Sequence, residues 1–141
     1  MSEDPTGDFQ SVFWAAKRAM ALASSAAFSR HGVHEGQQFI LRSLWAEDGL
    51  TPGELARRLG LATPTVTRAT ARMEASGLVR RVPDDRDRRL VRLQLTRRGR
   101  ELEEVIGREM AHLNERALAT FDSAERARLV VALNEIRRNL S

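Results

Sequence analysis

Two short helices in tandem, each with its own start and stop signal, constrain this chain more than any other feature of its sequence. Thr51 can cap the first helix, a proline follows at the first helical position, and Glu54 completes a capping box that satisfies free backbone N–H groups. Gly60 can take the left-handed conformation that ends this helix. Thr63, again followed by a proline, starts a second helix, which Gly77 ends. Two short helices joined by such a turn predict a helix-turn-helix unit.

The second helix has two different faces. At about 100° per residue, its apolar side consists of Val66, Ala69, Met73 and, more marginally, Thr70. The opposite side consists of Thr65, Arg68, Arg72 and Ala75, with Ala71 at its edge. That side offers hydroxyls and two guanidinium groups but no bulky apolar residue, as a helix that enters a major groove about 12 Å wide requires. A face that is merely solvated is the alternative.

A β-hairpin with an arginine-rich loop follows the second helix. The hydrophobic period changes to two, which predicts a half-buried strand at residues 91–95 with residues 78–82 as its partner. The loop, residues 83–89, is too long for a two-residue turn. It holds Asp84, Asp85, Arg86, Asp87, Arg88 and Arg89. Arginines at such a tip can reach a minor groove. The aspartates either keep the loop soluble or, as we prefer, Asp87 orients Arg89 through a charge-assisted hydrogen bond.

Charge is distributed unevenly along the 141 residues. Residues 51–100 hold 13 Arg and 5 Asp or Glu, a net charge of +8, whereas the rest of the chain carries −4 and the whole carries +4. A basic segment that coincides with a helix-turn-helix is the electrostatic pattern expected of a DNA-binding protein.

Several classes of protein are excluded or disfavoured by composition. The chain has no cysteine, so thiol redox sensing and Cys-ligated zinc are excluded. It has no apolar run long enough to span a bilayer, so no membrane partner is expected. The N-terminus is acidic and polar, unlike a secretory signal, and we expect a cytoplasmic protein. An enzyme is disfavoured because the chain lacks a phosphate-cradling glycine loop and a Ser, His and acid grouping with supportive spacing.

These residues together resemble the MarR family of winged-helix transcriptional regulators. The matching segments are TPGELARRLG, TPTVTRATARMEASGLVRR, PDDRDRRLVRLQLT and RRG. The family's D-x-x-D-R-R wing, its strand ending in Leu-Thr and its Gly-containing helix start correspond here to Asp84, Asp87, Arg88, Arg89, Leu95, Thr96 and Gly99. The match covers about half the chain. It implies a mainly α fold with a small two- to three-stranded β wing, in which a winged helix-turn-helix lobe is joined to a helical dimerisation base.

The order of the segments predicts the domains. Residues 1–7 are expected to form a disordered tail, residues 8–49 and 97–141 the helical dimerisation base, and residues 50–96 the DNA-binding lobe. The helix expected at residues 8–30 is apolar over more than one face, which indicates burial by a partner subunit. The last helix, opened by a capping box at Asp122 and Glu125, carries its own apolar stripe. First and last helices can interlock in a homodimer; a solitary helix hairpin is the alternative.

The long helix that Thr96 can cap begins with three arginines, Arg97, Arg98 and Arg100. Cations in the first turn oppose the helix dipole, at a cost of roughly 0.3–1 kcal/mol each. A broken local rule often marks a functional site. We therefore expect these arginines to face DNA phosphates or the wing.

A ligand site is implied by the resemblance, because MarR-like proteins bind small aromatic acids between the dimer helices and the DNA-binding lobe. The residues that could line it here are Phe13, Met20, Arg30, His31, His34 and Met110. An arginine or histidine would pair with a ligand carboxylate. The alternative is a capped turn with partly exposed imidazoles. The spacing of His31, His34 and His112 is not diagnostic of a metal site, so neither a metal nor a cofactor is predicted.

The sequence thus predicts a homodimeric regulator that binds double-stranded DNA specifically at a pseudo-palindromic operator. We expect it to act as a repressor and to lose affinity for DNA when it binds a small aromatic or phenolic ligand. The residues expected to contact DNA are Thr51, Thr63, Thr65, Thr67, Arg68, Arg72, Arg86, Arg88 and Arg89. An architectural DNA-binding winged helix without ligand control is the first rival. A winged helix that binds protein instead of DNA is the second, and the +8 segment argues against it.

Overall fold

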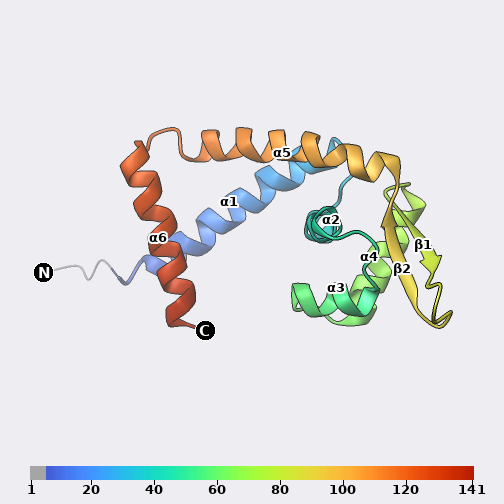
Figure 1. Ribbon diagram of the computed structural model, residues 1–141. Helices are drawn as coiled ribbons and strands as arrows, with labels where there is room; N and C mark the ends of the chain where they lie inside the picture. The colour runs from blue at the N-terminus through green and yellow to red at the C-terminus, as the bar shows by residue number, and fades with distance from the viewer. Residues whose placement is uncertain (1–5) are drawn as a thin grey trace, which may run out of the picture.

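The computed structural model describes residues 6–141, which form six helices and one two-stranded antiparallel sheet (Figure 1). The elements are α1 (Phe9–Ser29), α2 (Gln37–Ala46), α3 (Pro52–Leu59), α4 (Thr63–Ala75), β1 (Val79–Pro83), β2 (Val91–Leu95), α5 (Arg97–Ala117) and α6 (Ser123–Asn139). The predicted mainly α fold with a small β wing is confirmed. Of the predicted tail, residues 1–5 lie outside the described residues, and residues 6 and 7 belong to a turn before α1.

Most helix boundaries fall where the local signals predict them. The Thr51 hydroxyl accepts a hydrogen bond from the Glu54 N–H at 3.2 Å, and Gly60 ends α3 with a φ of 66°. The prediction that Thr63 caps α4 is wrong. Ala62 occupies the cap position without a side-chain bond, and Thr63 is already helical. Because the proline that follows Thr63 has no N–H, this helix start has one donor fewer to satisfy.

The hairpin forms with the predicted pairing direction and a loop displaced by one residue. Val79 pairs with Leu95 and Pro83 pairs with Val91, which leaves residues 84–90 as the wing loop. A single bridge between Leu50 and Leu93 adds a short third partner to the sheet. The sheet is therefore fixed to the segment that leads into α3.

The core lies where α2 meets the lobe and α5. Its largest fully buried side chains include Ile40, Leu41, Leu44, Leu50, Leu55, Met73, Leu78, Leu93 and Ile106. The helix α2 packs against α3, α4 and β2 on one side and against α5 on the other. It therefore joins the winged lobe to the long helices, and the lobe is held to α5 by apolar packing as well as by polar contacts.

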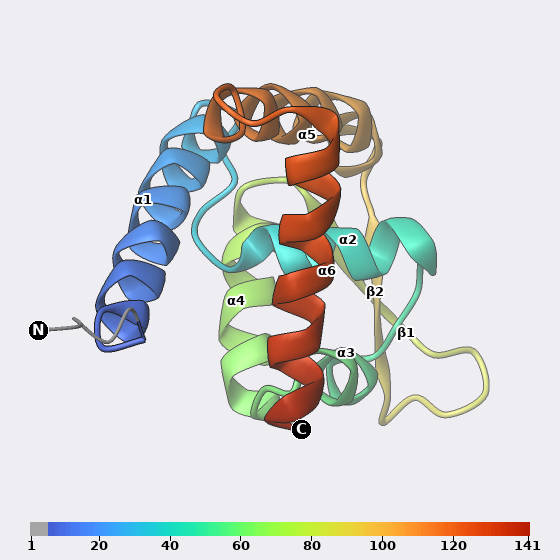
Figure 2. The ribbon, with the colours of Figure 1, turned by 90° about the vertical axis from the view of Figure 1, so that its left-hand side faces the viewer.

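The helices α1 and α6 expose apolar side chains that nothing in the described chain covers. No residue of α6 is buried, and Figure 2 shows α6 apart from α1, so the two do not form a hairpin within the chain. The exposed large apolar residues on these helices are Phe9, Val12, Trp14, Met20, Leu22, Leu129, Val130, Val131 and Leu133. None of the helices described is both long enough and apolar enough to cross a lipid bilayer.

Candidate nucleic-acid interface

The helix α4 presents a polar, positively charged face to solvent. Val66, Thr70 and Met73 are fully buried, whereas Arg68 and Arg72 are exposed on the opposite side. Thr65, Ala71 and Ala75 are exposed as well, so the division into two faces agrees with the sequence pattern. Because neither Arg68 nor Arg72 has an ion-pair partner within residues 6–141, both guanidinium groups are free to bind an anion.

The wing loop is held in shape by Asp84, whose side chain is only 12% exposed. Its carboxylate accepts hydrogen bonds from the backbone N–H of Arg86 at 3.1 Å and of Asp87 at 2.8 Å, and from Arg92 Nε at 2.6 Å. Arg92 also donates to the Gly49 carbonyl at 2.9 Å, which ties the loop to the lobe. The Arg92 guanidinium, helped by the two backbone N–H groups, holds the pKa of Asp84 below its usual range. The sequence did not predict this role, although Arg92 on the paired strand was a usable signal.

Asp87 makes a second set of bonds, to Arg89. Asp87 Oδ1 accepts from the N–H and from Nε of Arg89, both at 3.1 Å, and Oδ2 accepts from a terminal guanidinium nitrogen at 3.3 Å. The Arg89 hydrogen bonds lower the pKa of Asp87. Arg89 nevertheless remains 91% exposed, and the exposed side chains of Arg86 and Arg88 make no bond to the described residues. The loop therefore carries three solvent-facing cations on a backbone fixed by two carboxylates.

The threonines expected to contact DNA differ in availability. Thr51 is 9% exposed and its hydroxyl is used in the cap of α3, so its side chain offers little surface to DNA. Thr63 and Thr65 are exposed. Thr67 is half-buried, and its hydroxyl donates to the Thr63 carbonyl at 3.0 Å. Its oxygen can therefore act toward DNA only as an acceptor.

The three arginines at the start of α5 do not contact the wing loop, contrary to one of the expectations. Arg97 bonds Glu101 on its own helix at 3.0 Å, and Arg100 bonds Asp48 at 2.9 Å. Arg98 donates to two backbone carbonyls, those of Ser76 and His31. Hydrogen-bond partners within the chain therefore explain why three arginines occupy the first turn of α5, where positive charge opposes the helix dipole.

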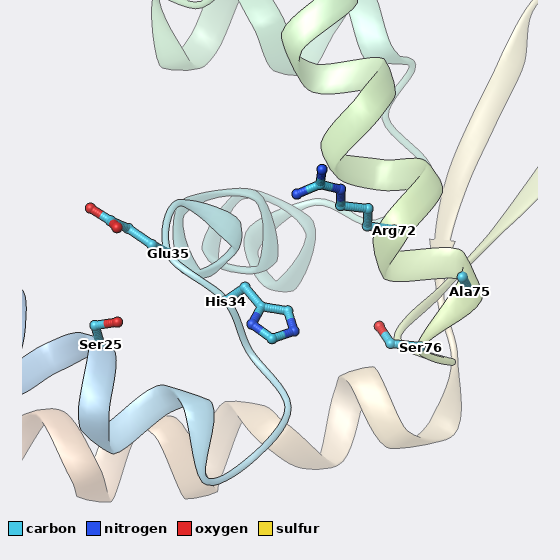
Figure 3. Close-up of a pocket in the computed structure, with 6 residues that line it drawn as sticks. All are labelled: Ser25, His34, Glu35, Arg72, Ala75 and Ser76. Atoms are coloured by element: carbon cyan, nitrogen blue, oxygen red, sulfur yellow. The ribbon is translucent and has the colours of Figure 1, made fainter.

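An open cleft of about 720 Å³ lies between the end of α1, the loop before α2, and α4. Ser25, His34 and Glu35 line it on one side, and Arg72, Ala75 and Ser76 line it on the other. In Figure 3 the Ser76 side chain, at the end of α4, points toward the imidazole of His34, and the Arg72 side chain extends from α4 farther from that ring. The cleft thus lies between α1 with the loop that follows it and the polar face of α4, which carries Arg72.

The six residues predicted to line one ligand site do not share one cavity within the single chain, so the site stays a prediction. Only His34 lines the cleft. Phe13 stacks on Phe9, Met20 is exposed on α1, and Met110 packs against the core. The residues spread out because α1 is straight and 21 residues long, so positions at its two ends cannot share one cavity.

Arg30 and His31 converge instead on Glu109 of α5. Arg30 donates to Glu109 Oε2 at 3.0 Å, and His31 Nε2 lies 3.0 Å from Oε1. The hydrogen bond from His31, together with the charge of Arg30, holds the pKa of Glu109 below its usual range. Among residues 6–141, no three His, Asp or Glu side chains are grouped as metal ligands would be.

Comparison with known proteins identifies the architecture. The model of the MarR family matches residues 33–91, which span α2, the helix-turn-helix, β1 and the wing loop and end at the first residue of β2. YybA from Bacillus subtilis (strain 168), an uncharacterised HTH-type transcriptional regulator, is 26% identical over 123 residues, covering 87% of this chain and 82% of its own. The chain belongs to the MarR family. It is therefore a DNA-binding transcriptional regulator and not an enzyme.

Two further comparisons support membership in the MarR family. The HTH-type transcriptional regulator TtmR from Methylorubrum extorquens (strain PA1) is 39% identical over 103 residues, which cover 71% of this chain but only 53% of TtmR. The structure of a MarR-family regulator from Listeria monocytogenes complexed with a 26mer DNA superposes with a TM-score of 0.73 at 25% identity. It covers 99% of this chain and 90% of its own.

Proposed function

We propose that this MarR-family chain acts as a homodimer that binds a pseudo-palindromic operator and represses transcription from it. The observation that carries the proposal is the coincidence of two exposed cationic surfaces on one lobe. One is the exposed face of α4 with Arg68 and Arg72, and the other is the wing loop with Arg86, Arg88 and Arg89. The Listeria regulator of the same fold was crystallised with a 26mer DNA, which supports the same use of the lobe here.

In this proposal each lobe occupies two neighbouring grooves. The helix α4 enters the major groove, where Arg68 can read a guanine through two hydrogen bonds and the hydroxyls of Thr63 and Thr65 can meet phosphates or bases. The arginines of the wing enter the adjacent minor groove, where the negative potential is strong. Asp84 and Asp87 fix the loop backbone before binding, so little conformational entropy is lost when DNA arrives.

The second copy of the chain is proposed to cover the apolar surfaces of α1 and α6. These helices expose large apolar side chains, among them Val12, Leu22, Val131 and Leu133. Apolar side chains gathered on exposed helices often mark a protein–protein interface. Two-fold symmetry would then place the two α4 helices about 34–36 Å apart, one turn of the DNA duplex. A pseudo-palindromic site follows from that symmetry.

The cleft is proposed to bind a small aromatic or phenolic acid that lowers the affinity for DNA. Its volume of about 720 Å³ lies in the range of small-molecule sites. Arg72 and His34 can pair with a carboxylate, and Ser25 and Ser76 can bind a hydroxyl. The ligand would thus lie between the base and α4, in a position to change the spacing of the two recognition helices.

One set of measurements tests the proposal. Sedimentation of the purified protein should give a dimer, and selection from a random duplex library should return a site of two inverted half-sites. Affinity for that duplex should fall steeply as salt is raised. Uniform coating of any duplex would instead favour an architectural protein, and no affinity at low salt would refute DNA binding. A screen of phenolic acids should find ligands that release the duplex, and a screen without any such ligand would refute the regulatory part alone.

A further inference from the structure

Arg98 joins two helix ends that are far apart in the sequence. One terminal guanidinium nitrogen donates to the Ser76 carbonyl at 2.9 Å, and the other donates to the His31 carbonyl at 3.4 Å. Ser76 is the C-cap residue of α4, and His31 follows the C-cap residue of α1. The carbonyls at helix C-termini carry partial negative charge and lack partners within the helix. A single cation therefore satisfies acceptors at the C-terminal ends of two helices.

This contact explains a position that is unfavourable locally. Arg98 lies in the first turn of α5, where a positive charge opposes the helix dipole. Placed there, its side chain extends over Gly32, whose φ is 76° and where an added Cβ would lie 2.7 Å from the Arg98 guanidinium. The glycine that this left-handed turn requires also leaves room for the Arg98 guanidinium beside it.

The two carbonyls belong to opposite sides of the open cleft. Ser76 itself lines the cleft from the side of α4, and His31 begins the loop whose residues His34 and Glu35 line the other side. The helix α5 runs past this end of the cleft in Figure 3. His31 is fixed to α5 a second time, by its ring nitrogen on Glu109 at 3.0 Å. Arg98 therefore spans the joint between the recognition helix and the helical base.

We propose that Arg98 is a positioning residue that fixes α4 relative to α1 and thereby sets the half-site spacing that the dimer accepts. The second part of this statement rests on the proposed function, because half-site spacing has meaning only for a dimer on two half-sites. The rival role for Arg98 is a phosphate contact, in which the guanidinium would leave both carbonyls and bind the DNA backbone. The two roles predict different effects of Arg98 substitutions on DNA affinity, on its salt dependence and on the preferred half-site spacing.

The test on DNA uses a duplex that the wild-type protein selects from a random library, the same duplex with one base pair inserted between the half-sites, and a random duplex. Arg98→Ala should weaken binding to the selected duplex by about three- to tenfold, since exposed charged hydrogen bonds are modest. It should also reduce the loss of affinity that the inserted base pair causes, because α4 is held less firmly relative to α1. The salt dependence on the random duplex should stay as in wild type, because no phosphate contact is lost.

Two further variants separate geometry from charge. Arg97→Ala removes the same charge from the same helical turn but breaks only the contact to Glu101, so the spacing penalty should be unchanged. Arg98→Lys keeps the charge but lacks the planar fork that reaches two carbonyls, so it should behave like Arg98→Ala. The proposal is overturned if Arg98→Lys behaves like wild type, or if Arg98→Ala weakens all three duplexes equally with a shallower salt dependence.

A measurement without DNA keeps this inference separate from the proposed function. Because the chain has no cysteine, Ala21→Cys on α1 and Ala71→Cys on α4 can be spin-labelled cleanly, with labelled chains diluted into unlabelled ones. Arg98→Ala should broaden the distance distribution between the two labels, whereas Arg97→Ala should not. An unchanged distribution in Arg98→Ala would refute the positioning role, whether or not the protein proves to bind two half-sites.

Discussion

The close approach of α5 to the hairpin makes Gly99 the most informative position for a stability test. A Cβ added at Gly99 would overlap the Leu78 carbonyl oxygen and would lie 3.2 Å from Leu95 Cδ2. The leucine side chain can move, but the carbonyl cannot move cheaply, because it accepts from both the N–H and the hydroxyl of Thr96, each at 3.1 Å. If the α5 backbone shifts instead, the hydrogen bond from Trp45 Nε1 to the Gly99 carbonyl, now 2.8 Å, is strained.

The expected magnitude follows from these contacts. Overpacking against backbone costs about 1–3 kcal/mol, and weakening the tryptophan bond adds roughly 0.5–1.5 kcal/mol. The better helix propensity of alanine returns at most about 1 kcal/mol. Gly99→Ala should therefore lower the free energy of unfolding by about 1–3 kcal/mol.

The same helix supplies a matched control. An added Cβ at Gly107 would meet nothing within 4 Å, so Gly107→Ala should stabilise the protein by about 0.5–1 kcal/mol. The two glycine variants should differ in melting temperature by on the order of 10 °C, measured by circular dichroism at one fixed protein concentration. Equal melting temperatures for Gly99→Ala and Gly107→Ala would refute the close approach of α5 to Leu78.

Three other outcomes are expected. Arg68→Ala should weaken binding to the selected duplex by about 1–3 kcal/mol in a fluorescence anisotropy titration if it reads a guanine, and an equal loss on a random duplex would assign it to a phosphate. The pKa of Asp84 is lower in the folded chain than in the unfolded one, so its stabilising effect is present above the ordinary value and is lost as the pH falls through the folded value. Asp84→Asn should therefore flatten the fall of melting temperature below pH about 4, and an unchanged acid profile would contradict that role for Asp84. Leu133→Asp should raise the dimer dissociation constant at least about 100-fold in sedimentation, because an unpaired carboxylate would be buried; a dimer that persists would exclude α6 from the interface.

Features whose contacts lie within a few residues could be predicted from the sequence. The caps at Thr51 and Thr96 and the reciprocal capping box of Asp122 and Glu125 all form as expected. Each consists of hydrogen bonds between residues three apart, so the sequence spacing already contains the geometry. The same holds for the contact of Asp87 with Arg89, two residues away. Thr63 is the exception, because it is already part of the helix and the cap position falls on Ala62, whose side chain cannot accept a hydrogen bond.

Contacts between distant segments could not be predicted in this way. The Asp48 carboxylate accepts from the Leu95 N–H at 2.9 Å and from Arg100 at 2.9 Å, across 47 and 52 residues. No local pattern marks Asp48, which reads as an ordinary polar residue at the end of α2. Its partners become visible only once the apolar packing of α2 against β2 and α5 has fixed where these elements lie.

The cleft shows the same limit in a functional setting. A resemblance to ligand-binding relatives pointed to residues of α1, of α5 and of the segment between α1 and α2, from which only His34 lines the cleft. Three other residues that line it, Arg72, Ala75 and Ser76, come from α4 and its C-cap. The sequence placed Arg72 correctly on the polar face of this helix but gave no sign that the same face also borders the cleft. That double role depends on the angle at which the lobe meets the base, which is a property of the tertiary structure.

The position of Arg72 has a consequence for how a ligand and DNA would act on each other. One guanidinium cannot pair with a ligand carboxylate in the cleft and with DNA at the same time, so the two would compete for it even without a change in lobe spacing. Because linkage is reciprocal, DNA would then weaken ligand binding by the same factor by which the ligand weakens DNA binding. Competition for Arg72 and a shift in helix spacing are separable contributions to ligand control. Only the shift in helix spacing would depend on the hydrogen bonds that Arg98 donates to the Ser76 and His31 carbonyls. Under the proposed function, substitution at Arg98 would therefore remove the contribution from helix spacing and leave the competition for Arg72.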